Sequence, residues 1–246
     1  MQKKTKRSFL LTGLLFLASI VFTLLVQTVD VQPIGPEQSL VGFAAINRFL
    51  FQQTGFQPFW YTVTDWIGIL ALLTAAGFAI TGLAQLIHRR SLQKVDRSLL
   101  LLGGFYILTA AVYVLFEIFT VNYRPVLIGG VLEASFPSSH VMFVYCIMAT
   151  AVMQFHHLVK NRAARAAFGV YAVIVIAVTV IGRFLSGVHW FTDLLGGLLI
   201  GSALILLYRS VVQMAGENPQ HKTGVNKKKS SEKARDTTYE HKKNRY

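Results

Sequence analysis

Three short polar segments, each at the end of an apolar run, contain residue types that could bind a phosphate and transfer it. They are Arg124-Pro125, Pro137-Ser138-Ser139-His140, and Arg183 followed by His189 and Asp193. A guanidinium group matches phosphate oxygens with a planar fork of donors, and an unprotonated imidazole can attack phosphorus as a nucleophile. The sequence therefore indicates phosphoryl transfer through a histidine, provided that the fold brings the three segments together.

His189 and Asp193 are four residues apart at the start of the last apolar run, a spacing that places two side chains on one helical face. The carboxylate could accept a hydrogen bond from one imidazole nitrogen, which fixes the tautomer and leaves the other nitrogen with a free lone pair. The alternative interpretation is an ordinary polar pair inside a helix bundle. Ionisable groups at membrane depth are costly, and this cost favours a functional role.

The other segments allow structural and functional interpretations side by side. Ser138 or Ser139 could simply cap a helix, yet the N–H groups at a helix start also form an anion site, and His140 could protonate a leaving oxygen. Arg183 is too far from His189 for one helical face, but a turn at Ser186-Gly187 would fold the arginine back toward the imidazole. The alternative for Arg183 is a side chain that extends to the membrane interface.

The elements that must position these residues are apolar helices. The 246 residues are 53% hydrophobic and 14% charged, and the mean hydropathy is +0.50. A helix needs about 20 residues to cross the hydrocarbon core. Six runs qualify, the fourth beginning near Ser138: 8–26, 66–87, 99–119, 141–155, 166–185 and 190–208. We expect an all-α, six-span bundle over 1–208, with the motifs in 99–208 and a disordered basic tail over 209–246.

The charge distribution predicts the orientation of this bundle. The segments 1–7, 88–98, 156–165 and 209–246 carry 4, 4, 3 and 10 of the 24 Lys and Arg residues. By the positive-inside rule, both termini are cytoplasmic and the three polar segments lie at the outer ends of their spans. We therefore expect a multi-pass plasma-membrane protein with an extracytoplasmic site. The net charge of +13 then reflects topology and membrane lipids rather than nucleic acid.

The outer segment between the first two spans has mixed character. Apolar residues over 40–51 recur at helical spacing, Pro58 ends this pattern, and the aromatic residues Trp60, Tyr61 and Trp66 follow. Such rings favour the boundary between headgroups and tails. We expect this stretch to lie on the outer surface, either as an interfacial helix or as a roof over the site. The sole cysteine, Cys146, falls within the fourth span and predicts a buried thiol.

Joined in this order, the three segments closely resemble the type 2 phosphatidic acid phosphatase family of integral-membrane lipid phosphatases. The family pattern is Lys, six residues, Arg-Pro; then Pro-Ser-Gly-His; then Ser-Arg, five residues, His, three residues, Asp. This chain departs from it at three positions, with Ser139 for the glycine, Gly182 for the serine and Glu117 for the lysine. A carboxylate repels phosphate at close range. Glu117 would therefore pair with Arg124, or point away while another group replaces the lysine.

The resemblance implies a double displacement that needs no metal or cofactor. His189 attacks phosphorus with Asp193 orienting it, His140 protonates the leaving group and then activates water, and the oxygens are held by Arg124, Arg183, Ser138 and amides near Ser139. The implied partner is an outer-leaflet lipid phosphate: undecaprenyl diphosphate, phosphatidylglycerol phosphate or phosphatidic acid. Two alternatives stay open, a lipid phosphotransferase with the same site and a catalytically inactive lipid-binding or transport relative, the latter suggested by Glu117. A soluble haloperoxidase has a similar site, but the six expected membrane spans argue against that class. The sequence contains no feature that indicates the oligomeric state.

Overall fold

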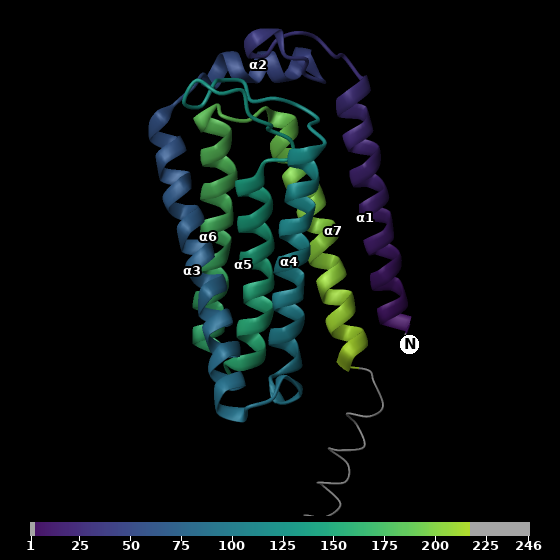
Figure 1. Ribbon diagram of the computed structural model, residues 1–246, viewed down its shortest axis with the longest axis vertical. Coiled ribbons are helices and arrows are strands. Elements are labelled where there is room, and N and C mark those ends of the chain that lie inside the picture. Colours follow the sequence, from purple (N-terminus) through teal and green to yellow (C-terminus); the bar gives the residue numbers. More distant parts are fainter. Residues whose placement is uncertain (1–2, 217–246) are drawn as a thin grey trace, which may run out of the picture.

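The computed structural model describes residues 3–216, and this part of the chain is helical (Figure 1). Its helices are α1 (Lys3–Thr28), α2 (Ala44–Thr54), α3 (Pro58–Arg89), α4 (Arg97–Ile118), α5 (Ser139–Leu158), α6 (Arg162–Ser186) and α7 (Phe191–Gly216), with short 3-10 turns η1 (Pro36–Gln38) and η2 (Leu92–Lys94) in the connections. Within the described residues, six of these helices are long and apolar enough to cross a membrane, α2 being the exception. The chain is a multi-pass membrane protein, and the predicted all-α, six-span fold is confirmed.

The helix boundaries follow local signals in the sequence. The first position of a helix tolerates proline, and Pro58 is the first residue of α3. Asn161 caps α6 by accepting from the Ala164 amide. The helix ends at Ser186 and is capped by Gly187, whose φ of 65° is a left-handed conformation that glycine adopts at little cost. The predicted turn at Ser186-Gly187 is therefore present.

Two boundaries differ from the sequence-based expectation. Pro58 starts a helix instead of ending one, so Trp60 and Tyr61 belong to α3 and not to a surface segment before it. The reason is that a proline at the first helical turn lacks only an N–H group that has no helical partner there. The last helix continues to Gly216, beyond the expected end at Tyr208, and residues 217–246 of the expected tail lie outside the described residues.

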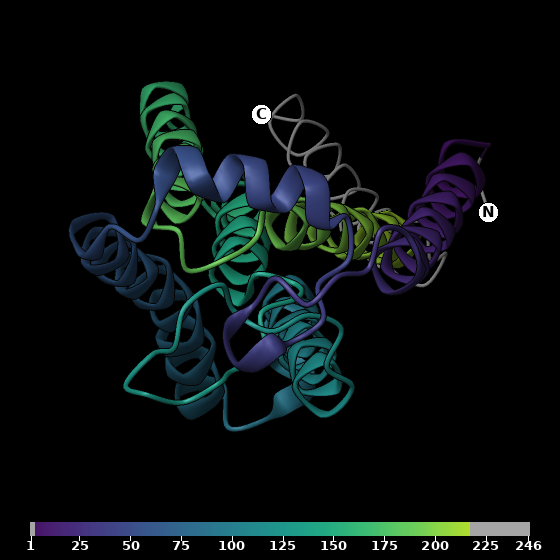
Figure 2. The ribbon, with the colours of Figure 1, turned by 90° about the horizontal axis from the view of Figure 1, so that it is seen from above.

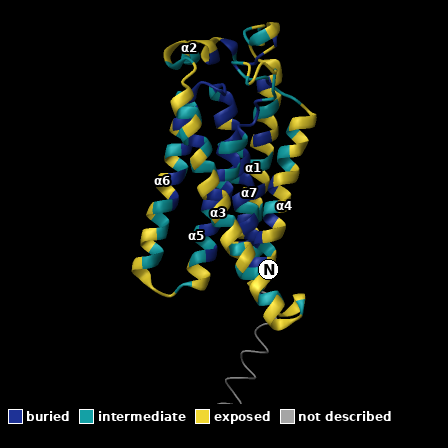
Figure 3. Ribbon diagram, turned by 60° about the vertical axis from the view of Figure 1, so that its left-hand side comes forward, coloured by how far each residue is buried: buried dark blue, intermediate teal, exposed yellow. Residues whose placement is uncertain are grey.

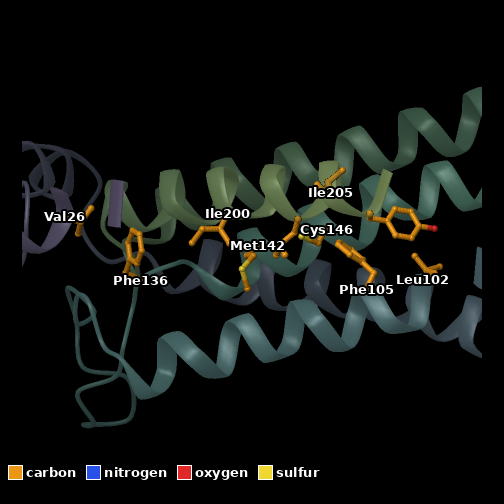
Figure 4. Close-up of a cluster of buried hydrophobic side chains, with 10 residues drawn as sticks. Val26, Leu102, Phe105, Phe136, Met142, Cys146, Ile200 and Ile205 are labelled. Atoms are coloured by element: carbon orange, nitrogen blue, oxygen red, sulfur yellow. The ribbon is translucent and has the colours of Figure 1, made fainter. Parts of the chain in front are cut away.

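The bundle is organised around α5, which packs against α3, α4, α6 and α7, while α1 packs along α7. Buried apolar side chains between α4, α5 and α7 form a continuous core that includes the Cys146 thiol (Figure 4). The outer faces of the long helices expose large apolar side chains, as expected where lipid replaces water (Figure 3). The start of α1 and the last turn of α7 lie at the same end of the bundle, opposite α2 (Figure 1).

Small residues allow the loop before α5 to lie against the first turns of α7. A Cβ at Gly196 would overlap the Phe136 ring, and a Cβ at Gly197 would lie 3.0 Å from the Ser138 carbonyl oxygen. The Ser138 amide donates to the Asp193 carbonyl oxygen at 3.0 Å, which joins the two segments directly. The glycines of α7 thus determine where the start of α5 lies.

The segment before α3 crosses the same end of the bundle (Figure 2). In α2, the Asn47 side chain donates to the Thr192 hydroxyl at 2.9 Å and accepts from the Thr192 amide at 3.3 Å. The Gln57 amide donates to the Ser186 carbonyl at 2.9 Å. The predicted amphipathic helix therefore exists as α2, and it covers the junction between α6 and α7 as a roof.

Candidate active site

The three polar segments meet at the end of the bundle that α2 covers. Arg124 lies in the loop between α4 and α5, Ser138 precedes α5, Ser139 and His140 form its first turn, Arg183 lies in the last turn of α6, His189 lies in the loop after it, and Asp193 lies in the first turn of α7. Hydrogen bonds and ion pairs connect these elements, as described below. All seven candidate residues therefore converge at one end of the fold.

His189 is almost fully buried and is held by a backbone carbonyl. Its Nδ1 atom lies 3.1 Å from the Ser135 carbonyl oxygen, whereas the Asp193 carboxylate is 3.7 Å from the same nitrogen. The carbonyl can only accept, so this contact defines the tautomer with hydrogen on Nδ1. The lone pair then lies on Nε2, which is buried and has no hydrogen-bond partner among residues 3–216. This is the form of imidazole that a nucleophile requires.

His189 does not share a helical face with Asp193, because α7 begins only at Phe191. The fully buried carboxylate instead accepts from the Trp190 amide at 2.8 Å and from the Asn122 side chain at 3.3 Å. Asp193 thus fixes the backbone next to His189 and ties it to the loop after α4. Asp193 therefore influences the position of the imidazole through the backbone, while the Ser135 carbonyl accepts the hydrogen bond from Nδ1.

Burial and two arginines set the charge state of His189. Burial first, and then the positive charges of Arg124 and Arg183, lower the pKa of His189 well below its usual value. The neutral imidazole is therefore favoured at neutral pH, and it carries the lone pair needed for attack.

Arg183 is fully buried in the last turn of α6. Its Nη2 atom contacts the carboxylate of Asp65, and its guanidinium carbon lies 5.1 Å from the centroid of the Tyr61 ring. The Nε and Nη1 atoms have no hydrogen-bond partner among the described residues. Because a buried donor without a partner is costly, these groups are suited to an anion that enters the site. Arg183 does not extend to the interface.

Arg124 is mostly buried, and its ion pair partner is Glu133. The Nε atom lies 3.0 Å from the Glu133 carboxylate, and the Arg124 amide donates to the Glu133 carbonyl at 3.0 Å. The sequence did not assign a role to Glu133, and the structure places its carboxylate against Arg124. Glu117 is exposed near the end of α4, and the carboxylate that pairs with Arg124 is that of Glu133 and not that of the residue in the lysine position. Arg124 Nη1 is buried without a hydrogen-bond partner in residues 3–216.

The start of α5 adds hydroxyl groups and backbone amides. Ser138 is fully buried, and its hydroxyl has no hydrogen-bond partner within the described part of the chain. Ser139 opens the helix and is half-buried. The first amides of a helix lack carbonyl partners and carry a positive partial charge, so this end of α5 favours an anion. The hydroxyl of Ser138 and the amides beside it can serve the same phosphate as the arginines.

Sequence reasoning missed Asp65. Its Oδ1 atom lies 3.1 Å from His140 Nε2 and also contacts Arg183, so one carboxylate oxygen joins α5 and α6. The available signal was an ionisable residue within an apolar helix, but the expected second span began at residue 66 and left Asp65 outside it. The Ser135 carbonyl and Asn122 were also missed, since a backbone carbonyl has no signature in a sequence.

An apolar groove of about 400 Å³ begins at this site and runs between α3, α4 and α5. Its polar end is formed by Asp65 and His140, and its apolar walls include Leu72, Phe143 and Ile147. Within residues 3–216, no group of three or more His, Cys, Asp or Glu side chains is arranged as a metal site. The geometry thus places buried phosphate-type donors beside a groove suited to a hydrocarbon chain.

Similarity to known proteins agrees with these features. The sequence model of the PAP2 superfamily matches residues 98–217, the part of the chain that carries all three polar segments. In structure the chain resembles the transmembrane PAP2-type phosphatidylglycerolphosphate phosphatase of Bacillus subtilis, with 21% identity, a TM-score of 0.57, and coverage of 82% of this chain and 96% of that one. No curated protein matches it significantly in sequence. Residues 98–217, which carry all three polar segments, therefore belong to the PAP2 superfamily, the family of type 2 phosphatidic acid phosphatases.

Proposed function

We propose that this protein is a membrane lipid phosphate phosphatase that works through a phosphohistidine on His189. The observation that carries the proposal is the buried Nε2 atom of His189. It has no hydrogen-bond partner among the described residues, while Nδ1 is held by the Ser135 carbonyl. The guanidinium nitrogens without a hydrogen-bond partner in residues 3–216, Nη1 of Arg124 and Nε and Nη1 of Arg183, provide the matching anion site. A nucleophile and donors for phosphate oxygens together support phosphoryl transfer.

In the first step, the lone pair on His189 Nε2 forms a bond to phosphorus, and the bond from phosphorus to the leaving oxygen breaks. This oxygen belongs to a lipid alkoxide in a phosphate monoester and to a lipid phosphate in a diphosphate. The departing oxygen keeps the electron pair and takes a proton from His140. Arg124, Arg183, Ser138 and the amides near Ser139 hold the three equatorial oxygens, where charge spreads in the transition state. The Asp193 carboxylate keeps the backbone around His189 in place through the Trp190 amide.

In the second step, a water molecule attacks the phosphohistidine. His140, now neutral, takes a proton from this water, and the bond between phosphorus and His189 breaks. Inorganic phosphate leaves, His189 again has its lone pair, and His140 is again protonated. The cycle therefore balances as the hydrolysis of one phosphate ester or phosphoanhydride bond by one water molecule.

The groove beside His140 supports a lipid as the substrate. Its apolar walls would hold the first part of a hydrocarbon chain, while the phosphate reaches the arginines. Candidates are an isoprenoid diphosphate such as undecaprenyl diphosphate, and glycerolipid phosphates such as phosphatidic acid and phosphatidylglycerol phosphate. The last is the substrate in the name of the Bacillus subtilis protein.

The charge distribution supports an extracytoplasmic site in the plasma membrane. The inner segments of the predicted topology hold 21 of the 24 Lys and Arg residues, and α1 starts at the end of the bundle opposite α2. With both termini cytoplasmic, the site would face lipids of the outer leaflet. Residues 1–208 would then belong to the phosphatase domain.

Phosphate release by the purified protein tests this function. The protein in detergent is incubated with lipid phosphates, with and without a chelator, and we expect chelator-resistant phosphate release that ranks the substrates. His189→Ala should abolish release, while the control His156→Gln, at the opposite end of α5, should retain it. Unchanged turnover by the His189→Ala variant would refute the assignment of His189 as the nucleophile. Label found on a lipid acceptor would instead identify a phosphotransferase, and lipid binding without any turnover an inactive relative.

A further inference from the structure

Asp65 is a carboxylate of α3 that joins two residues of the site from different helices. Its Oδ1 atom is 3.1 Å from Nε2 of His140 in α5, and it also contacts Nη2 of Arg183 in α6. The Asp65 side chain is 40% exposed, whereas Arg183 is completely buried. A single oxygen thus links the candidate proton donor to a guanidinium group of the phosphate site.

The packing of α3 fixes Asp65 in this place. Tyr61 and Gly68 lie four and three residues from Asp65 and share its helical face. The Tyr61 ring stacks on the guanidinium of Arg183, at 5.1 Å from its carbon atom. A Cβ at Gly68 would lie 3.3 Å from the imidazole of His140, so only a glycine allows this approach without movement. The position of the carboxylate therefore follows from close helix contacts.

The contact between α3 and α6 is equally close. Thr64 is fully buried and lies so near Gly182 that a Cβ there would overlap its methyl group. Gly182 directly precedes Arg183, and it stands where the family pattern has a serine. The glycine thus lets α3 approach close enough for Asp65 to reach the arginine.

We propose that Asp65 is a positioning residue for this reaction, holding the His140 imidazole and favouring the protonated form that gives its proton to the leaving lipid oxygen. This inference rests on the proposed phosphatase function. Asp65 accepts from Nε2–H of His140, and Nδ1 is then the nitrogen that gives a proton to the alkoxide and later takes one from water. The same carboxylate holds Nη2 of Arg183 and leaves its Nε and Nη1 for phosphate.

The charges around His140 give Asp65 this role. The groups whose charge acts on His140 are Arg183 of α6, Arg124 of the loop before α5, His189 of the loop before α7, and Asp65 of α3. Burial and both arginines oppose a positive imidazole, and Asp65 is the negative group among the four. Of these groups, the Asp65 carboxylate in contact with Nε2 is the one that favours a proton on His140.

Two substrates with different leaving groups distinguish this role from a purely structural one. A lipid alkoxide needs a proton as it leaves, whereas p-nitrophenolate leaves without one. Asp65→Asn keeps an oxygen that accepts from Arg183 but removes the negative charge. We expect kcat/KM, which reports formation of the phosphohistidine, to fall about 10- to 100-fold on a lipid phosphate, at or below the lower end of the about 10²- to 10⁴-fold contribution of acid–base catalysis, and by no more than about threefold on p-nitrophenyl phosphate. KM should change little on either substrate.

The matched control is Glu37→Gln, which removes an exposed carboxylate in η1 and should leave both activities unchanged. Thermal unfolding in detergent shows whether each variant is folded. An equal loss on both substrates would overturn the role in proton transfer. A rise in kcat/KM would overturn it differently, since it would mean that Asp65 competes with phosphate for Arg183. If the wild-type protein hydrolyses neither substrate, the proposed function itself fails.

Discussion

Replacing Arg183 tests the phosphate site most sharply, because its side chain is fully buried and two of its groups have no hydrogen-bond partner in the described chain. In Arg183→Ala, the transition state loses the hydrogen bonds from Nε and Nη1. Each hydrogen bond to a charged group contributes about 1.5–3 kcal/mol. Two of them amount to about 3–6 kcal/mol, and kcat/KM should fall about 10²- to 10⁴-fold, at a factor of ten for each 1.36 kcal/mol.

Arg183→Lys should give an intermediate loss. Lysine keeps the positive charge near Asp65 but offers a point charge in place of a planar fork, and it loses the stacking on Tyr61. We expect one of the two phosphate contacts to survive, so kcat/KM should fall about 10- to 100-fold relative to the wild type.

The assay is steady-state phosphate release from a lipid phosphate in detergent. Arg48→Ala is the matched control, because Arg48 is an exposed arginine of α2 at the same end of the bundle, with a side-chain contact to Gln32 at 3.4 Å. Thermal unfolding separates loss of the fold from loss of catalysis. An Arg183→Ala protein that is folded and turns over within twofold of the wild type would refute the assignment of Arg183 to phosphate.

Three other outcomes follow from the same contacts. Gly196→Val should destabilise the protein by about 1–3 kcal/mol, measured by thermal unfolding, because its side chain would overlap Phe136. Asn122→Ala removes a donor to Asp193 and should lower kcat about tenfold with KM unchanged. The lowered pKa of His189 keeps the imidazole neutral, so kcat/KM should hold on acidification to below about pH 6 before it falls.

The six spans could be predicted from the sequence because long apolar runs interrupted by charged segments have few alternative structures. The convergence of Arg124, His140 and His189 at one end also followed, since the positions of Lys and Arg along the chain predict which ends of the spans lie together. What hydropathy could not determine was the first helical residue of α3. A proline can either end or begin a helix. The second span was expected to start at residue 66, eight residues after the start of α3 at Pro58, so Asp65 was not assigned to a helix.

The hydrogen bond of His189 shows a second limit. A spacing of four residues suggested that Asp193 binds the imidazole, but α7 starts after His189, and the backbone carbonyl of Ser135 accepts the hydrogen bond instead. Such a carbonyl comes from a loop folded against the site from another part of the chain. The partner of Arg124 could not be predicted for the same reason. The Arg124 amide donates to the Glu133 carbonyl within the loop between α4 and α5, and this contact brings the Glu133 carboxylate to the guanidinium group.

The central claim is that phosphate passes through His189, and trapping the intermediate tests it most directly. Lipid phosphate labelled with ³²P is mixed with the protein and quenched under denaturing, alkaline conditions, because a bond between phosphorus and nitrogen breaks in acid. We predict label on His189 in the wild type and none in His189→Ala. Labelled His189→Ala protein, or a wild type that releases phosphate without ever carrying label, would contradict the account.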